Sequence, residues 1–290
     1  MRAYKVVDVF TARPLLGNPV AVVLDADGLS TEEMQAIAGW TNLSETTFVL
    51  SPTTTKADYR LRIFTPRSEL PFAGHPTLGS AHALLEAGRS MSRQDGRLIQ
   101  ECGIGLVDLT IDEHDGGRQL SFDLPSAKIV PLQAGEIAEL ERILQRKLNA
   151  QITPAIVDVG AIWVIAQLPD AASVLDLRPD LARLAEFEQR LRVTGLTVFG
   201  AYAQGDAAIE VRTFAPSCGV TEDPVCGSGN GSVAAFHWQF GLLPPGGGGY
   251  VAAQGRCVGR DGRIQINVDS AGKVRVGGSC VTCVEGSLML

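Results

Sequence analysis

Residues 62–81 read RIFTPRSELPFAGHPTLGSA and can be laid over residues 212–235, which read RTFAPSCGVTEDPVCGSGNGSVAA. The first positions match at an offset of 150, and the later ones match at 153, which requires a three-residue insertion in the second copy. The matched pairs are Arg62 and Arg212, Phe64 and Phe214, Pro66 and Pro216, Pro71 and Pro224, and Gly74 and Gly227. Such self-similarity indicates an internal repeat, so the sequence predicts two homologous halves, roughly residues 1–125 and 126–290.

In each copy a strand pattern leads through a proline-containing loop into a helix pattern opened by glycine. The helix patterns Pro76–Ala87 and Gly231–Phe240 are apolar on nearly every face, which is typical of buried helices. Short β-branched or alternating runs separated by turn residues predict mostly antiparallel sheet. We therefore expect an α+β fold in which each half is a sheet rolled around a central helix, with a pseudo-twofold cleft between the halves. Three further helix patterns are Thr31–Trp40, Gly135–Leu148 and Leu181–Leu191.

Composition excludes several classes of protein. The chain has 290 residues, of which 45% are hydrophobic and 20% are charged, as in ordinary globular proteins. Its net charge is -7 and no basic cluster is longer than a pair, which argues against nucleic acid or an anionic membrane as the main partner. No apolar run reaches about 18 residues, the start lacks the apolar core of a signal peptide, and the cysteines are too sparse for a disulfide scaffold. We therefore expect a soluble, acidic, cytoplasmic globular protein.

The two glycine-opened helices predict an anion site. Gly74-His75-Pro76 and Gly227-Ser228-Gly229 both stand where a buried helix begins. The first turn of a helix carries unpaired N–H groups and about half a positive charge, which suits a carboxylate. An acidic protein can thus hold an anionic ligand with backbone groups. The alternative is that these glycines only let helix and sheet approach closely.

Three side chains near these helices are candidates for chemistry. Glu45, in NLSETTFVL, is expected at the entrance to a buried strand, as either a surface residue or a desolvated acid and base. His75 and Asp223 lie in the loops that open the buried helices, where a helix N-terminus disfavours protonation of histidine and stabilises the charge of aspartate. Each also has a simpler interpretation, because His75 could only pack and Asp223 could only cap its helix.

The patterns that hold common cofactors are missing from the sequence. It has no HExxH, no paired CxxC and no cluster of aspartates, which argues against a metal site. No GxGxxG leads from a strand into a helix of a parallel unit, and GxxxxGK[ST] and GxSxG are missing too. The single Cys280-Val-Thr-Cys283 is assigned to packing. We therefore expect no cofactor.

Several segments resemble the PhzF (phenazine biosynthesis-like) family, which belongs to the diaminopimelate epimerase-like superfamily. NLSETTF and ELPFAGHPTLG are the most specific of them. The matching segments are GNPVAVV from Gly17, MQAIAGWTNLSETTFVL from Met34, RIFTPRSELPFAGHPTLGSAHAL from Arg62, VDVGAIWVIAQL from Val157, RTFAPSCGVTEDPVCGSGNGSVAAF from Arg212, and the Gln254-Gly255…Gly259-Arg260 pattern. The resemblance implies two duplicated α+β domains with the active site in the cleft between them. It also implies a cofactor-independent isomerase, usually a homodimer.

The resemblance also assigns roles to individual residues. Glu45 matches the family's catalytic glutamate, which moves a proton between ring carbons of a dihydro-hydroxyanthranilate in the phenazine enzyme. His75 and Asp223 match substrate-contacting residues, and Gly74 and Ser228 match loop positions that contact polar groups of the substrate. Gly227, Gly229 and Cys226 complete the expected substrate-binding set at the second helix.

Cys226 departs from the commoner family pattern, which has threonine there. In diaminopimelate epimerases and proline racemases this position is one of two catalytic cysteines, and the other falls at Ala73, which cannot act as a base. Glu101-Cys102-Gly103 imitates an epimerase motif, but it lies outside the aligned repeat. A helix N-terminus is also expected to lower the pKa of the Cys226 thiol.

These observations predict an isomerase that moves a proton on a small carboxylate-bearing cyclic or amino-acid-like substrate. Glu45 would remove and return the proton, while His75, Asp223 and the helix N-termini would hold the substrate. Two alternatives remain at this stage. One is an amino-acid racemase or epimerase that uses Cys226 with Glu45, and the other is a non-catalytic small-molecule binder.

Overall fold

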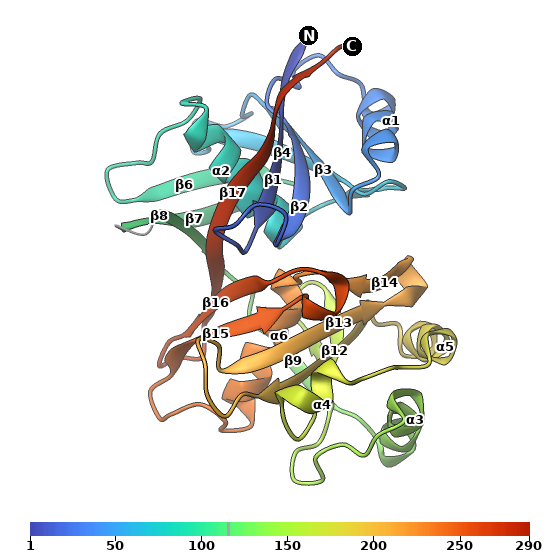
Figure 1. The fold of residues 1–290 in the computed structure, drawn as a ribbon. Helices are drawn as coiled ribbons and strands as arrows, with labels where there is room; N and C mark the ends of the chain where they lie inside the picture. Colours follow the sequence, from blue (N-terminus) through green and yellow to red (C-terminus); the bar gives the residue numbers. More distant parts are fainter. Residues whose placement is uncertain (115–116) are drawn as a thin grey trace. The chain divides into compact units, whose positions relative to one another are not determined.

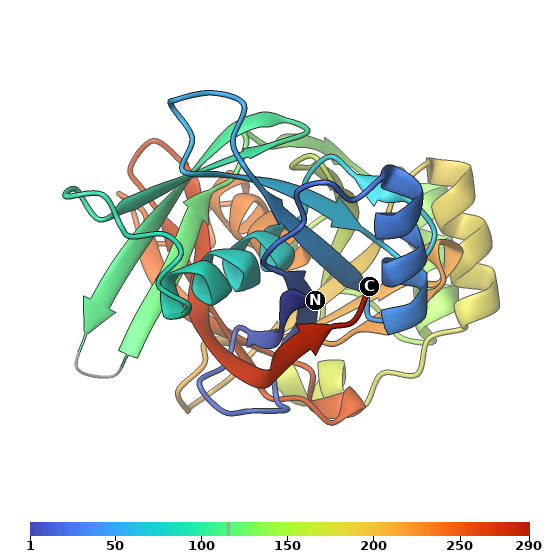
Figure 2. The same ribbon diagram turned by 90° about the horizontal axis from the view of Figure 1, so that it is seen from above.

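The computed structural model describes residues 1–114 and 117–290, and the chain divides into two compact units. Unit 1 consists of Met1–Phe122 and Gly277–Leu290, and unit 2 consists of Asp123–Val276. The expected halves, 1–125 and 126–290, differ from these units because the last fourteen residues belong with the first part of the chain. The two termini consequently lie side by side (Figures 1 and 2).

The strands of unit 1 close into a barrel (Figure 1). In chain order they are β1 (Arg2–Val9), β2 (Asn18–Val23), β3 (Glu45–Leu50), β4 (Tyr59–Phe64), β5 (Glu69–Leu70), β6 (Arg97–Cys102), β7 (Gly105–His114), β8 (Gly117–Asp123) and β17 (Val274–Leu288). Antiparallel pairs join β17 to β1, β1 to β2, β3 to β4, β6 to β7 and β7 to β8, whereas β2–β3 and β4–β6 are parallel. Pairing of β8 with β17 closes the ring, and β5 adds to the edge of β4.

Unit 2 repeats this order of strands. Its strands are β9 (Lys128–Pro131), β10 (Ala155–Asp158), β11 (Ile162–Gln167), β12 (Gly195–Ala201), β13 (Ile209–Ala215), β14 (Val220–Asp223), β15 (Gly248–Gln254) and β16 (Gly262–Val268). Along the sheet β9, β10 and β11 pair antiparallel, β11–β12 is parallel, β12–β13 antiparallel, β13–β15 parallel and β15–β16 antiparallel. The strands of unit 1, taken from β17 through β1, β2, β3, β4 and β6 to β7, follow the same order of antiparallel and parallel pairs. The structure therefore confirms the duplication and the expected rolled, mostly antiparallel α+β fold.

A buried helix occupies the centre of each sheet, as expected. α2 (Gly74–Glu86) packs against β1, β2 and β3, and α6 (Gly227–Gln239) packs against β10, β11, β12 and β16. Small residues permit this close packing. A Cβ on Gly79 of α2 would lie 2.4 Å from Cγ1 of Val20, and one on Gly231 of α6 would lie 2.1 Å from Cδ1 of Leu124. Glycine therefore lets α2 approach Val20 of β2, and it lets α6 approach the side chain of Leu124, which follows β8.

The remaining helices lie outside the sheets. α1 (Thr31–Thr41) begins with the expected capping box, in which Ser30 and Glu33 bond each other's backbone N–H groups. α3 (Ala134–Leu144) ends before the expected Leu148, and α5 (Leu181–Leu191) has the expected bounds. The short helices are α4 (Ala171–Leu175), η1 (Pro216–Cys218) and η2 (Arg256–Val258). Among the described residues, no helix is long and apolar enough to span a membrane.

Candidate active site

Glu45 and His75 meet in unit 1. Glu45 is the first residue of β3, and His75 lies in the first turn of α2. Nε2 of His75 is 3.3 Å from Oε2 of Glu45, and the exposed fractions of the two side chains are 9% and 16%. The sequence predicted that both residues line a site, and the structure brings them into contact. The small exposed fraction of Glu45 and its buried Oε2 atom favour the desolvated interpretation over the surface one.

His75 is neutral at physiological pH. Burial disfavours its charged form and lowers its pKa to about 3, although a hydrogen bond to the backbone of Pro19 opposes this shift. Proline has no N–H, so the imidazole must be the donor in that bond. Nε2 has no hydrogen-bond partner among the described residues, so Nδ1 donates to Pro19 and Nε2 keeps a lone pair. The contact between His75 and Glu45 therefore becomes a hydrogen bond when the Glu45 carboxyl carries a proton.

The first turn of α2 leaves backbone donors available. Its N-cap, Ala73, makes no side-chain hydrogen bond, and Pro76 has no N–H. The N–H groups of Gly74 and His75 have no acceptor within the described part of the chain. Gly74 is also required by packing, since a Cβ there would lie 2.8 Å from Cζ of Phe122. The geometry is thus compatible with both interpretations of Gly74, as a residue that lets the helix approach its neighbours closely and as part of an anion site.

Asp223, Cys226 and Ser228 gather at the start of α6 in unit 2. Asp223 ends β14, and Oδ1 accepts a hydrogen bond of 3.0 Å from the N–H of Val225. Cys226 is the N-cap of α6, and its sulfur accepts from the N–H of Gly229 at 3.3 Å. Oγ of Ser228 lies 3.6 Å from that sulfur. All the predicted substrate-binding residues of the second repeat therefore lie within one turn and its preceding loop.

Burial changes the acidity of this cluster in a direction opposite to the sequence-based expectation. Desolvation is the largest effect on Asp223 and raises its pKa to about 6, although the hydrogen bond from Val225 opposes it. Burial also raises the pKa of the Cys226 thiol well above its usual value, and the charge of Asp223 adds to this. The expected stabilisation of both anions by the helix N-terminus is thus outweighed by desolvation.

The pKa of Asp223 predicts a pH-dependent stability. The folded protein holds this proton more tightly than the unfolded chain, in which the pKa is near the usual 3.8. The contribution of Asp223 to stability is therefore greatest below pH 4 and falls as the pH rises to about 6. Asp223→Asn should remove that fall and be roughly 1–3 kcal/mol more stable than wild type at pH 7.5. Urea unfolding at pH 4.5 and pH 7.5 measures the difference, and an equal difference at both pH values would contradict the assignment.

The duplicated positions in the two units carry different chemistry. Thr46 pairs with Phe64 and Leu196 pairs with Phe214, which makes Gly195 the counterpart of Glu45. A Cβ on Gly195 would lie 2.1 Å from the carbonyl oxygen of Phe214, so that position excludes a side chain. At the offset of 153 residues, the counterpart of His75 is Ser228, that of Leu70 is Asp223, and that of Ala73 is Cys226. Unit 1 thus holds the Glu45–His75 pair, and unit 2 holds the Asp223–Cys226–Ser228 cluster.

Sequence reasoning missed three residues that support the second cluster. Nε1 of Trp163 donates to Oγ of Ser228 at 3.1 Å, which leaves the hydroxyl proton of Ser228 for the Cys226 sulfur at 3.6 Å or for a ligand oxygen in its place. Gln254 and Asn230 bond the backbone around Cys226. Trp163 and Gln254 occurred only within segments that match the family, so no chemical signal in the sequence singled them out.

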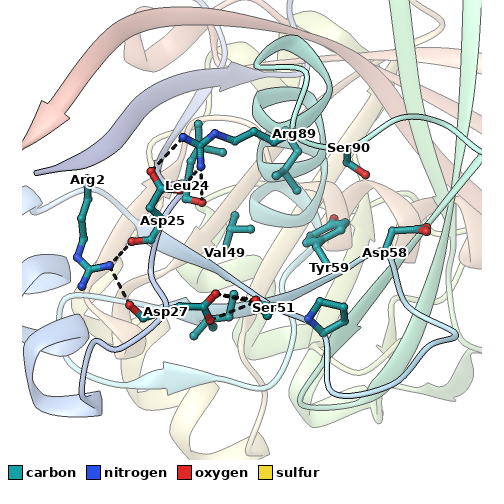
Figure 3. A pocket seen from close by; sticks show the side chains of 13 residues that line it. Arg2, Leu24, Asp25, Asp27, Val49, Ser51, Asp58, Tyr59, Arg89 and Ser90 are labelled. Carbon is teal, nitrogen blue, oxygen red and sulfur yellow. Dashed lines mark hydrogen bonds and ion pairs between the residues drawn. The ribbon is translucent and has the colours of Figure 1, made fainter.

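A pocket of about 470 Å³ lies at the other end of the unit 1 barrel (Figure 3). Its walls include Leu50, the last residue of β3, about 16 Å along the strand from Glu45. Arg89 and Arg2 both reach Asp25 there, and Ser51 donates to Asp27. Asp58, which also lines the pocket, is paired with Arg93, so the carboxylates of this pocket already have partners. No group of three potential metal ligands occurs among the residues with described positions.

Comparison with known proteins gives a consistent assignment. The family model for phenazine biosynthesis-like protein matches residues 7–286. The chain is 45% identical to antisense-enhancing sequence 1 of Schizosaccharomyces pombe, over 98% of this chain and 97% of that protein. It is 33% identical to the trans-2,3-dihydro-3-hydroxyanthranilate isomerase of Pseudomonas chlororaphis, over the full length of both. In fold it matches the Bacillus anthracis phenazine biosynthesis protein of the PhzF family, with a TM-score of 0.89, 24% identity, and coverage of 100% of this chain and 99% of that one.

Proposed function

The chain belongs to the phenazine biosynthesis-like family and is an isomerase, and we propose that it moves a proton within a small carboxylate-bearing substrate without a cofactor. The contact between Glu45 and neutral His75 supports this most directly. A carboxylate that can receive a proton beside an imidazole acceptor is suited to general acid–base catalysis. The substrate class proposed is cyclic or amino-acid-like.

In the proposed reaction Glu45 is the group that exchanges the proton. Its carboxylate forms an O–H bond as the substrate C–H bond breaks, and the electron pair moves into the substrate's unsaturated system. The resulting carboxylic acid donates to Nε2 of His75, which stabilises this protonated state. Glu45 then returns the proton to a different carbon, so that atoms and charge balance and no external acid is consumed.

The unit 2 cluster supplies groups suited to substrate binding. The N–H groups of Gly227 and Ser228 have no acceptor among residues of described position, and the start of a helix favours a carboxylate. The hydroxyl of Ser228, oriented by Trp163, can donate to an oxygen of the substrate. The partly buried carboxyl of Asp223 can accept from an amine or hydroxyl when it is ionised.

Deuterium incorporation tests this function. Trans-2,3-dihydro-3-hydroxyanthranilate and a panel of cyclic amino acids are incubated with the protein in D₂O and followed by mass spectrometry. We expect isomerisation of at least one of them, with deuterium entering the product carbon. Binding of a ligand without any exchange would support the non-catalytic binder instead. The homodimer expected from the resemblance and the cytoplasmic location expected from the sparse cysteines stay predictions.

Cys226 separates the proposed isomerase from a racemase. We expect Cys226→Ser and Cys226→Thr to change turnover less than tenfold, about 1.4 kcal/mol in barrier, because the raised pKa of the thiol makes it a poor base at neutral pH. A racemase that uses this cysteine would lose several orders of magnitude in both variants. The measurement is turnover of the identified substrate with solvent deuterium tracked, and loss of exchange in folded Cys226→Ser would favour the racemase.

A further inference from the structure

Gln254 is a buried amide that bonds three groups around the second cluster. It is the last residue of β15, and its exposed fraction is 1%. Oε1 accepts from the N–H of Cys226 at 3.1 Å and from Nδ2 of Asn230 at 2.7 Å. Nε2 donates to the carbonyl oxygen of Asp223 at 2.9 Å. Both ends of the amide are thus engaged, so its orientation is determined by its partners.

These bonds hold the loop between Asp223 and Cys226 at both ends. Asn230 adds to the arrangement, since its Nδ2 also donates to the carbonyl of Cys226 at 2.9 Å. The amide of Gln254 therefore links the backbone of Asp223 to β15, and it also accepts the hydrogen bond from the N–H of the N-cap residue, Cys226. The next two N–H groups, those of Gly227 and Ser228, have no acceptor in the described part of the chain, so they can bond a ligand.

The corresponding loop of unit 1 lacks such an amide. Tyr59 pairs with Gln100 on β6, and its counterpart Ile209 pairs with Ala252 on β15, so the counterpart of Gln254 is Cys102. The glycines that follow confirm the equivalence. A Cβ on Gly103 would lie 2.7 Å from Cα of Pro71, and one on Gly255 would lie 2.6 Å from the carbonyl oxygen of Pro224.

Unit 1 does contain a buried glutamine on the equivalent strand, but it has other partners. Gln100 accepts from the hydroxyl of Tyr59 at 3.0 Å and donates to Oγ1 of Thr77 at 3.1 Å. It therefore bonds side chains within the barrel and leaves the loop before α2 alone. Among the described residues of unit 1, no side-chain amide makes the bond that Gln254 makes to the carbonyl of Asp223 in unit 2.

We infer that Gln254 is a positioning residue for the isomerase reaction. It acts through Asp223, because it fixes the orientation in which the carboxyl of Asp223 and the N–H groups of Gly227 and Ser228 meet the substrate. The inference rests on the proposed function. Two further observations favour a role beyond stability. The bonds converge on the backbone of proposed substrate-contacting residues, and the amide is missing from the counterpart loop.

Substitutions of Gln254 should shift the titration of Asp223 in opposite directions. The titratable groups that affect Asp223 within unit 2 are Glu222 on the same strand and Cys226 at the helix start. Gln254→Leu releases the loop and admits water, which relieves the desolvation that raises the pKa of Asp223, so the midpoint should fall from about 6. Gln254→Glu places a second carboxyl against the loop, and like charge should raise the midpoint.

The experiment combines a titration and an activity measurement. Carbon-13 NMR of aspartate-labelled protein follows the Asp223 carboxyl from pH 4 to 8, with Asp223→Asn identifying its resonance. The pH profile of kcat/KM is measured with the substrate identified above. Gln100→Leu is the matched control, because it also removes a buried glutamine with two side-chain partners. We expect Gln254→Leu to lower kcat/KM at least about tenfold and Gln100→Leu to change it less than about twofold, while both lower the melting temperature by several degrees.

The outcomes separate the inference from the proposed function. An Asp223 midpoint that is unchanged in both Gln254 variants, with kcat/KM no lower than in Gln100→Leu, would overturn the inference and leave Gln254 a structural residue. Wild-type protein that isomerises no member of the panel would contradict the proposed function. The NMR titration needs no substrate, so in that case it still decides whether Gln254 sets the state of Asp223.

Discussion

Glu45→Gln is expected to lower turnover by at least 10²–10⁴-fold, about the contribution of one general acid–base group, with the fold and ligand affinity nearly intact. The amide has almost the same shape as the carboxyl but cannot carry a proton between carbons. Its NH₂ group can still donate to the lone pair on Nε2 of His75, so the 3.3 Å contact survives the substitution. Turnover and deuterium incorporation measure the loss, and ligand-induced thermal stabilisation measures the retained affinity.

Glu101→Gln is the matched control for this prediction. Glu101 lies on β6 of the same barrel, and its carboxylate bonds Thr53 in a loop beyond β3. It belongs to the Glu101-Cys102-Gly103 sequence that imitates an epimerase motif, yet it has no contact with Glu45 or His75. We expect its turnover to stay within about twofold of wild type. Near-wild-type turnover in Glu45→Gln would disprove the mechanism, and a large loss in Glu101→Gln would show that the loss is not specific to the carboxyl beside His75.

The repeat made most of the fold predictable, because it encodes local elements that each copy forms again. Small residues with glycines at the start predicted the buried helices α2 and α6, and Ser30 with Glu33 predicted the start of α1. The pairing of β17 with β1 was missed, since it joins opposite ends of the chain and leaves no local pattern. That the two units have the same strand order was evident only from the strand pairings of the structure, because no single sequence segment encodes that order.

The candidate site was predictable to a lesser degree. The predicted site residues stay predictions, although the structure places two of them, Glu45 and His75, in contact. The lowered pKa of His75 has the expected direction, whereas the pKa shifts of Asp223 and Cys226 were not predictable, because a helix N-terminus and burial act on a carboxyl or thiol in opposite directions. Which of these two effects is larger at Asp223 and Cys226 depends on how deeply packing buries each group, and the sequence does not show this. The shared cleft expected for the two helix N-termini stays a prediction.

The duplication also offers two copies of one ion pair in different surroundings. In unit 2, Arg212 bonds Glu222 through two nitrogens at 2.9 and 2.7 Å, and a third nitrogen donates to the carbonyls of Val174 and Leu177. In unit 1 its counterpart Arg62 bonds Glu69 through two nitrogens at 2.7 and 2.6 Å. The geometry of each pair is alike, but the burial differs. The exposed fractions are 6% and 8% for the pair in unit 2, and 19% and 38% for the pair in unit 1.

Arg212→Leu is therefore expected to destabilise the protein by about 3–5 kcal/mol, because it leaves the carboxylate of Glu222 buried without its partner and two carbonyls without a donor. Arg62→Leu should cost only about 1 kcal/mol or less, because water can reach Glu69 when the arginine is removed. Urea unfolding of the two variants measures both free energies in one protein. Equal losses would show that burial does not decide the strength of this pair. A double variant, Arg212→Leu with Glu222→Leu, should recover much of the loss, since removing both charges avoids the unpaired carboxylate.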